Sequence, residues 1–208
     1  MRIYLVRHPE TQWNKENRFQ GQTDIPITEK GLHDLQTAAP ILASLSVQTI
    51  YTSPLKRAKV VAQEVSKLTG KAFHEDRRIM EVNCGRWEGE TVPHLMQAEP
   101  NLIEQWWKDP YNFQIPGGES YEDVERRTTS FLKEIVDKGE DALVVSHGIA
   151  ILTMLRYVLQ IPKNHVRSIR IDNLAIVRLD GDGNGLSLSM VNPARFLLTR
   201  TEITNIDD

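Results

Sequence analysis

The sequence contains a single cysteine, Cys84, among its 208 residues. An intramolecular disulfide is therefore excluded, and so is a zinc site built on several thiolates. We expect Cys84 to be an ordinary small side chain with a buried or half-buried thiol.

Long hydrophobic runs are also absent. The apolar run at the N-terminus meets Arg7-His8 at once and is too short for the core of a signal peptide. The most apolar later stretch, residues 142–159, is interrupted by Ser146, His147 and Arg156, so it does not resemble a membrane span. We therefore expect no membrane association and a cytoplasmic location.

The chain carries little excess charge, with a formal net charge of -3 and an isoelectric point near 6.1. A basic face for nucleic acid is not expected at this balance, although a local pocket can still be strongly cationic. The hydrophobic fraction of 40% and the charged fraction of 25% are ordinary for a globular protein. The length suits one domain with its own core, so we expect a single domain over residues 1–208.

Strand and helix patterns alternate through most of the sequence. Residues 2–6 are β-branched, aromatic and aliphatic, as in a fully buried strand, and Pro9 ends that strand. Further strands are predicted at 47–52, 71–75, 141–146 and twice within 168–192, and helices at 28–45, 53–68, 119–138 and 148–159. This alternation predicts an α/β fold, a three-layer α/β/α sandwich with a mostly parallel central sheet.

Residues from about 77 to 118 depart from this alternation. They hold three of the four tryptophans and four of the ten prolines, with two helical stretches at 91–98 and 102–108. We interpret this segment as a helical lid inserted over a pocket. Its aromatic residues are expected mainly to pack the lid, with one or two free to stack on a substrate. Residues 10–26 form a long predicted loop, and the polar tail after Phe196 is expected to fray.

Polar residues follow three predicted strands at the point where each strand ends. Arg7 and His8 follow the first strand, Arg57 comes soon after the second, and His147 follows the strand at 141–146. Because the carboxyl ends of parallel strands lie at one edge of the sheet, we expect these four side chains to converge. The helix starts near Pro54 and Gly148 would add backbone N–H donors for an anion.

This set of two guanidinium and two imidazole groups matches a phosphoryl group. Guanidinium groups bind phosphate oxygens bidentately, and a neutral imidazole nitrogen is a competent nucleophile. Nearby arginines disfavour the imidazolium form and so lower the pKa of a histidine. Metal catalysis is disfavoured, since two arginines would repel a cation and no closely spaced histidine pair is present. A serine hydrolase is disfavoured because the sequence has no Gly-x-Ser-x-Gly elbow.

The stretch Leu5-Val6-Arg7-His8-Pro9-Glu10-Thr11 resembles the Leu-Val-Arg-His-Gly-Glu-Thr signature of the histidine phosphatase superfamily, also called the phosphoglycerate mutase-like family. Similar motifs follow in the family's order over most of the chain. They are Trp13-Asn14, Asn17-Arg18-Phe19-x-Gly21, Ile27-Thr28-x-x-Gly31, Ser53-Pro54-Leu55-x-Arg57-Ala58, Glu81-x-x-x-Gly85-x-Trp87-x-Gly89, Gly117-Gly118-Glu119-Ser120 and Val145-Ser146-His147-Gly148.

The resemblance implies a role for each matching residue, and it implies that neither a metal nor a cofactor is needed. His8 would be the nucleophile and Glu81 the proton donor to the leaving alkoxide. The other implied site residues bind the phosphoryl group or line the substrate side of the pocket. They are Arg7, Arg57, His147 and Asn14 for the phosphoryl group, and Gln20 for the substrate.

One position departs from the family pattern. Pro9 stands where the family usually has glycine. Proline has no N–H and pushes the preceding residue toward extended geometry. Any phosphate hydrogen bond from that N–H would be absent, which allows for weaker catalysis or an altered pocket.

Three functions fit these residues. The first is a phosphatase of a small phosphorylated metabolite, with α-ribazole phosphate as the candidate substrate. The second is a 2,3-bisphosphoglycerate-dependent phosphoglycerate mutase, and the third is a catalytically silent binding protein. We favour the phosphatase because the segment between Glu81 and Ser146 is short and because Val82-Asn83-Cys84-Gly85 replaces the Arg-His-Tyr-Gly usual in the mutases. A homodimer through the C-terminal edge strand is the candidate assembly.

Overall fold

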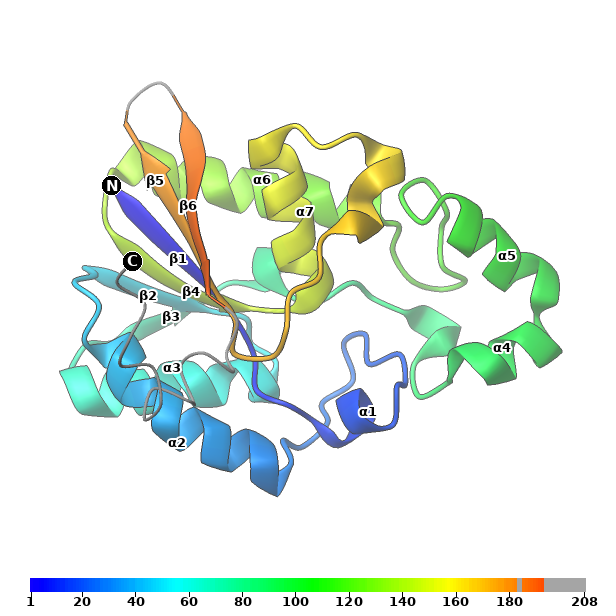
Figure 1. Ribbon diagram of the computed structural model, residues 1–208, viewed down its shortest axis with the longest axis horizontal. Coiled ribbons are helices and arrows are strands. Elements are labelled where there is room, and N and C mark those ends of the chain that lie inside the picture. Colours follow the sequence, from blue (N-terminus) through cyan, green and yellow to red (C-terminus); the bar gives the residue numbers. More distant parts are fainter. Residues whose placement is uncertain (183–184, 193–208) are drawn as a thin grey trace, which may run out of the picture.

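The computed structural model describes residues 1–182 and 185–192 of the chain. Its centre is a six-stranded sheet in the order β3-β2-β4-β1-β5-β6 (Figure 1). The first four strands along the chain run parallel, whereas β5 is antiparallel to β1 and β6 to β5. The strands are β1 (Arg2–Arg7), β2 (Thr49–Thr52), β3 (Phe73–Glu75), β4 (Ala142–Ser146), β5 (Ile176–Gly181) and β6 (Leu186–Asn192).

Helices cover both faces of this sheet and extend beyond one end of it (Figure 1). The α-helices are α1 (Gln12–Lys15), α2 (Glu29–Ala43), α3 (Lys56–Thr69), α4 (Val92–Ala98), α5 (Pro100–Lys108), α6 (Tyr121–Lys138) and α7 (Gly148–Leu159). Short 3-10 helices are η1 (Arg77–Ile79), η2 (Gly85–Trp87) and η3 (Lys163–Ser168). Among the described residues, no helix has the length and apolar character needed to cross a membrane.

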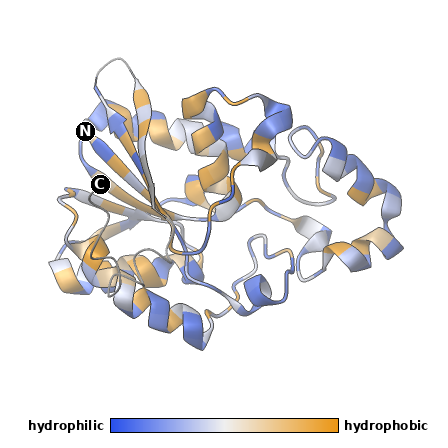
Figure 2. Ribbon diagram, viewed as in Figure 1, coloured by the Kyte–Doolittle hydropathy of each residue, from blue (hydrophilic) through white to orange (hydrophobic). Residues whose placement is uncertain are grey.

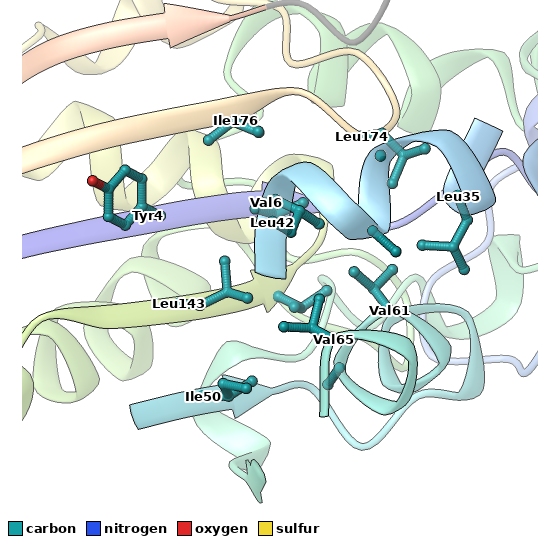
Figure 3. Close-up of a cluster of buried hydrophobic side chains, with 14 of the residues drawn as sticks. Tyr4, Val6, Leu35, Leu42, Ile50, Val61, Val65, Leu143, Leu174 and Ile176 are labelled. Atoms are coloured by element: carbon teal, nitrogen blue, oxygen red, sulfur yellow. The ribbon is translucent and has the colours of Figure 1, made fainter. Parts of the chain in front are cut away.

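One face of the sheet packs against α2 and α3. Val6 and Ile50 of the sheet meet Leu35 of α2 and Val61 of α3 in a single buried cluster (Figure 3). Hydrophilic and hydrophobic segments alternate along α2, as expected for a helix with one buried side (Figure 2). The apolar periodicity that predicted this helix therefore identified the side that contacts the sheet.

The opposite face packs against α6 and α7. Leu5 and Val144 lie in a second buried cluster with Phe131 of α6 and Ile151 of α7. β1 and β4 are thus buried on both faces, as their unbroken apolar runs predicted. The expected three-layer α/β/α sandwich with a mostly parallel sheet is confirmed.

The segment interpreted as a lid forms α4 and α5, which lie at the end of the molecule remote from the N-terminus (Figure 1). It has its own buried cluster, with Trp87, Ile103 and Trp106 at its centre. Trp87 stacks on Phe113 and is fully buried, so these aromatic rings mainly pack the lid, as expected. Cys84 is buried in the same cluster.

Two local predictions were wrong. The predicted loop at 10–26 contains α1, which Thr11 starts with a capping box to Asn14. The second helix begins at Lys56, with Leu55 as its N-cap, and not at Ser53-Pro54. The Ser53 hydroxyl instead contacts His147. β6 is the edge strand on which the homodimer prediction depends, and the predicted fraying tail lies outside the described residues.

Candidate active site

The C-terminal end of β1 carries His8. Its backbone N–H donates to the carbonyl oxygen of Ser146 at 3.0 Å, which continues the pairing between β1 and β4. In the side chain, Nδ1 lies 2.7 Å from the carbonyl oxygen of Pro9. A carbonyl oxygen can only accept a hydrogen bond, so Nδ1 carries the proton of the neutral ring. The lone pair of Nε2 is therefore available as a nucleophile.

His147 follows β4 and faces His8, with the two ring centroids 5.2 Å apart. Its Nε2 lies 2.7 Å from Oγ of Ser53, a residue at the end of β2. The same Oγ accepts a hydrogen bond from the N–H of Leu55, and we assign the serine hydroxyl proton to the contact with His147. With this assignment, the proton of neutral His147 lies on Nδ1. Three neighbouring strand ends thus contribute to one histidine pair.

Backbone carbonyl groups hold the two arginines in place. Arg7 donates from Nη1 to the carbonyl oxygen of Ile171 at 2.6 Å. Arg57, in the first turn of α3, donates to the carbonyl oxygens of Gly21 at 2.7 Å and Thr23 at 2.8 Å. Because carbonyl groups are neutral, they orient each guanidinium group without cancelling its charge.

Three buried N–H donors at this site are unpaired within the described residues. They are Nε of Arg7, Nε of Arg57 and Nδ1 of His147. A buried donor without a partner costs about 1–3 kcal/mol, so native proteins rarely retain one without a reason. Unpaired donors on two guanidinium groups that form no ion pair within the described residues indicate a site for an anion with several oxygen atoms.

The same surroundings keep both histidines neutral. Burial is the main cause that holds the pKa of His8 well below its ordinary value, and the charges of Arg57 and Arg7 add to it. Burial and the charge of Arg57 likewise lower the pKa of His147. The hydrogen bond to Pro9 opposes the shift at His8 and does not overcome it. The imidazole of His8 is therefore unprotonated near neutral pH.

The side chain of Glu81, which follows η1 in the sequence, places its carboxyl group at the start of α7. Its Oε1 accepts hydrogen bonds from the N–H groups of Ile149 at 3.2 Å and Ala150 at 3.3 Å, and from its neighbour Val82 at 2.9 Å. The carboxyl group thus occupies the N-terminus of this helix, where backbone N–H groups that have no partner within the helix hold it in a fixed position. A Cβ atom on Gly148 would lie 3.6 Å from Nε of Arg7 and 3.7 Å from Oε2 of Glu81. The glycine keeps the space between these two groups open.

Asn14, in α1, and Gln20 both lie in the segment that follows His8. Oδ1 of Asn14 accepts hydrogen bonds from the N–H of Thr11 at 3.0 Å and from Nδ2 of Asn173 at 3.3 Å, so its amide nitrogen is the group that can meet an anion. Oε1 of Gln20 accepts a hydrogen bond from Oγ1 of Thr11 at 2.8 Å. Asn173 also donates to the carbonyl oxygen of His8 at 2.9 Å.

A cavity of about 450 Å³ joins these groups. Seven of the eight predicted site residues line it, namely Arg7, His8, Asn14, Gln20, Arg57, Glu81 and Gly148. The eighth, His147, is fully buried and reaches the site through its contact with His8. The rest of the wall is largely apolar, formed by Phe19, Val82, Trp106, Ile115, Tyr121, Ile149, Leu152, Ile169 and Ile171, with Arg18 and Arg170 also present.

The family model of the histidine phosphatase superfamily (branch 1) matches residues 3–193, almost the whole chain. The chain belongs to the histidine phosphatase superfamily. The resemblance that the sequence motifs carried is therefore confirmed, and so is the prediction of an enzyme that acts as a phosphoric monoester hydrolase. The likeness extends through the lid and both layers of helices.

Known proteins of this superfamily resemble the chain over nearly its full length. A probable phosphoglycerate mutase GpmB of Salmonella choleraesuis is 34% identical over 86% of this chain and 85% of its own. A mycobacterial glucosyl-3-phosphoglycerate phosphatase, solved with VO3, is 26% identical, with a TM-score of 0.83 and coverage of 92% and 99%. The α-ribazole phosphatase of Shigella flexneri has a TM-score of 0.85 at 24% identity, covering 93% and 97%, which is a likeness of fold alone.

Sequence reasoning did not assign several residues that organise this site. Ser53 was expected to begin the second helix, yet it lies before that helix and beside His147. Its place directly after a strand is the same signal that identified His8 and His147. Asn173 and the carbonyl group of Ile171 come from a stretch with no such signal, and only the tertiary structure brings them to the site.

Proposed function

We propose that this protein is a metal-independent phosphomonoesterase that transfers the phosphoryl group of a small phosphate ester to Nε2 of His8. The observation that supports it best is the set of unpaired buried donors on Arg7, Arg57 and His147 beside this unprotonated nitrogen. Phosphoryl transfer depends mainly on positioning and on stabilising charge on the equatorial oxygens, and these donors supply both.

The first chemical step in this proposal forms a phosphohistidine. The lone pair of Nε2 of His8 forms the N–P bond while the bond between phosphorus and the ester oxygen breaks. Glu81 gives its proton to the leaving oxygen, so the alcohol departs neutral. The positive charge that develops on the ring is shared with the carbonyl oxygen of Pro9 through Nδ1–H. Since this bond uses the carbonyl group, the missing N–H of Pro9 does not weaken it.

The second step returns the enzyme to its starting state. A water molecule attacks phosphorus on the side opposite His8 and transfers a proton to the carboxylate of Glu81. The N–P bond breaks, inorganic phosphate forms and His8 becomes neutral again. Over both steps one ester and one water give one alcohol and one phosphate, with no metal or cofactor in the balance.

The substrate that we propose carries an apolar or aromatic group next to its phosphate. The cavity is larger than a phosphoryl group, and its remaining wall includes Phe19, Trp106 and Leu152. The two further arginines of that wall each have a carboxylate partner, Glu16 for Arg18 and Asp172 for Arg170. An α-ribazole phosphate, which is an aromatic ribonucleotide, fits such a wall better than a small polyanion does.

A phosphoglycerate mutase is the second candidate, and the likeness to GpmB is the observation that favours it. In that reaction a hydroxyl group of the substrate, and not water, accepts the phosphoryl group from His8. The substrate would then bring a carboxylate to a wall that is largely apolar. Burying an unpaired carboxylate there would be costly, which is why we place the phosphatase first.

The test is phosphate release from a panel of esters in EDTA, with a phosphoglycerate mutase assay on the same samples. The panel contains α-ribazole phosphate, phosphoserine and 3-phosphoglycerate. We expect release in EDTA with preference for the aromatic ester, and an acid-labile, base-stable phosphoenzyme. His8→Ala should abolish both, whereas His33→Ala, on the exposed side of α2, should change neither.

Each result that differs from this expectation would contradict a different part of the proposed function. Full activity in His8→Ala would disprove the nucleophile assignment, and loss of activity in EDTA would disprove the metal-independent mechanism. Interconversion of phosphoglycerates without net phosphate release would favour the mutase. If the protein binds these esters and neither reaction occurs, the binding protein would be the correct interpretation.

A further inference from the structure

The backbone around Glu81 has no helix or strand to hold it. Residues 80–84 lie between η1 and η2 without regular secondary structure. Their carbonyl groups cannot be satisfied by a ladder of hydrogen bonds and need partners elsewhere. A side chain on such a segment is positioned only as well as those partners hold its backbone.

Arg127 of α6 supplies the partners of two of these carbonyl groups, those of Met80 and Glu81, and it also binds the carbonyl group of Arg78 just before the segment. Its Nη1 donates to the carbonyl oxygens of Arg78 at 2.8 Å and Met80 at 2.6 Å, and its Nη2 donates to that of Glu81 at 2.9 Å. Nε and Nη2 also donate to Glu119 at 2.9 Å and 3.0 Å. All five N–H groups of a guanidinium are thereby used, and none of them meets the substrate cavity.

Glu119 holds the other end of the same segment. Its Oε2 accepts a hydrogen bond from the N–H of Asn83 at 2.9 Å, and its own N–H donates to the carbonyl oxygen of Asn83 at 2.8 Å. Arg127 and Glu119 are both largely buried, with 18% and 23% of their side chains exposed. The pair therefore fixes the backbone on both sides of Glu81, whose carboxylate is held separately by the start of α7.

We infer that Arg127 and Glu119 are positioning residues for Glu81, and that they control proton transfer to the leaving group. The inference rests on the proposed function, because it matters only if Glu81 is the proton donor. Arg127 sits on a helix whose Phe131 and Ile135 are buried against the sheet, so it ties an irregular segment to a rigid element. A shift of this backbone would move the Glu81 carboxyl group, whereas His8 and Arg7 have no hydrogen bond to residues 80–84 among the described residues and would keep their positions.

The experiment compares two aromatic esters that differ in leaving group, p-nitrophenyl phosphate and 2-phenylethyl phosphate. Only the alkyl ester needs a proton on its leaving oxygen, and kcat/KM reports the steps up to its departure. We expect Arg127→Met to lower kcat/KM about tenfold for the alkyl ester, part of the roughly 10²–10⁴ that a general acid contributes. For the nitrophenyl ester, kcat/KM should fall by less than about threefold. Arg127→Lys should recover part of the loss, since lysine keeps a charge and three donors.

The neighbouring Arg126 offers a matched control. Its side chain is 74% exposed, and its one ion pair among the described residues is with Asp123. Arg126→Met should therefore leave kcat/KM unchanged for both esters. Should Arg127→Met fail to fold, Glu119→Gln tests the same pair with a smaller change, and a selective loss in the same direction is expected. Equal losses for both esters, or no loss, would overturn the inference.

Glu81→Gln separates this inference from the proposed function. If Glu81→Gln lowers kcat/KM equally for both esters, Glu81 is not the proton donor, and the positioning role of Arg127 and Glu119 is wrong as well. If Glu81→Gln is selective for the alkyl ester and neither Arg127→Met nor Glu119→Gln is, the proton donor is correct and the positioning role alone is wrong.

Discussion

At the scale of single residues, the site depends on where two imidazole protons lie. His8 and His147 are both buried and neutral, and each has one ring nitrogen bound to a neutral oxygen. The carbonyl oxygen of Pro9 leaves Nε2 of His8 as a base, and the hydroxyl of Ser53 leaves Nδ1 of His147 as a donor. The two rings can thus do opposite tasks although they have the same chemistry.

These neutral histidines predict a stability that depends on pH. Because their pKa values are lowered in the folded state, the unfolded chain binds more protons below about pH 6.5. Stability is therefore full above that pH and falls as the pH decreases toward the folded-state values. Each histidine should lower the free energy of unfolding by up to about 1.4 kcal/mol for each pH unit below 6.5. Urea unfolding at pH 7.5 and at pH 5.5 measures this difference.

Paired variants identify the source of that pH dependence. The double variant His8→Asn/His147→Asn should lose much less stability between the two pH values than the wild type does. The double variant His33→Gln/His165→Gln changes two exposed residues and should behave as the wild type. An unchanged pH dependence in the first double variant would show that other groups cause it.

At the scale of elements, the site needs a close contact between two irregular segments. Residues 117–120 lie against residues 83–85, and the N–H of Arg86 donates to the carbonyl oxygen of Pro116 at 3.0 Å. A Cβ atom on Gly118 would lie 2.2 Å from the carbonyl oxygen of Asn83, which is closer than atoms can approach. The Gly-Gly-Glu-Ser motif is therefore explained by this contact and by the bonds of Glu119.

Gly118→Ala should accordingly affect catalysis as well as stability. The added methyl group must push the segment that carries Glu81, so we expect kcat/KM for an alkyl phosphate to fall at least tenfold. Gly139→Ala is the control, since Gly139 has a φ of +68° and open space around its Cβ position. That variant should lose about 1 kcal/mol of stability through backbone strain and keep its kinetics. Equal kinetics for both variants would contradict this account.

At the scale of the whole molecule, the lid packs in a buried cluster distinct from the two on the sheet, and that cluster includes Val124 of α6 and Leu152 of α7. β1 and β4 are buried between two layers of helices, whereas α4 and α5 pack around Trp87 and Trp106 beyond the end of the sheet. The cavity lies where the lid cluster approaches the start of α7. Trp106 and Ile115 of the lid line this cavity, so the lid forms part of the wall that a substrate would meet.

Hydrogen exchange should resolve these two units. Amides of β1 and β4 should exchange last, and those of α4 and α5 earlier, because elements with a smaller core open at lower free energy. Orthovanadate, which has oxygens like those of phosphate, should slow exchange at residues 18–22 and 81–88. Mass spectrometry of exchanged peptides measures both effects. If α4 and α5 exchange as slowly as β4, the lid and the sheet form one cooperative unit.

The sequence by itself determined the layers of the fold and the chemistry of the site. Apolar runs and helical spacing are local properties, so β1, β4 and α2 were predictable from their own residues. The rule that parallel strands end at one edge then brought Arg7, His8 and His147 together. The same local reasoning failed at Ser53, which was expected to begin a helix, because its hydroxyl contacts a residue 94 positions away.

Only the tertiary structure decided which groups at the site are paired and which are left for a ligand. The protons of His8 and His147, the unpaired Nε atoms of Arg7 and Arg57, and the apolar wall all depend on neighbours distant along the chain. The same holds for the support of Glu81 by Arg127, a residue 46 positions away on a helix. Hydrogen bonding and burial depend on distance in space, and a single sequence carries no direct record of that distance.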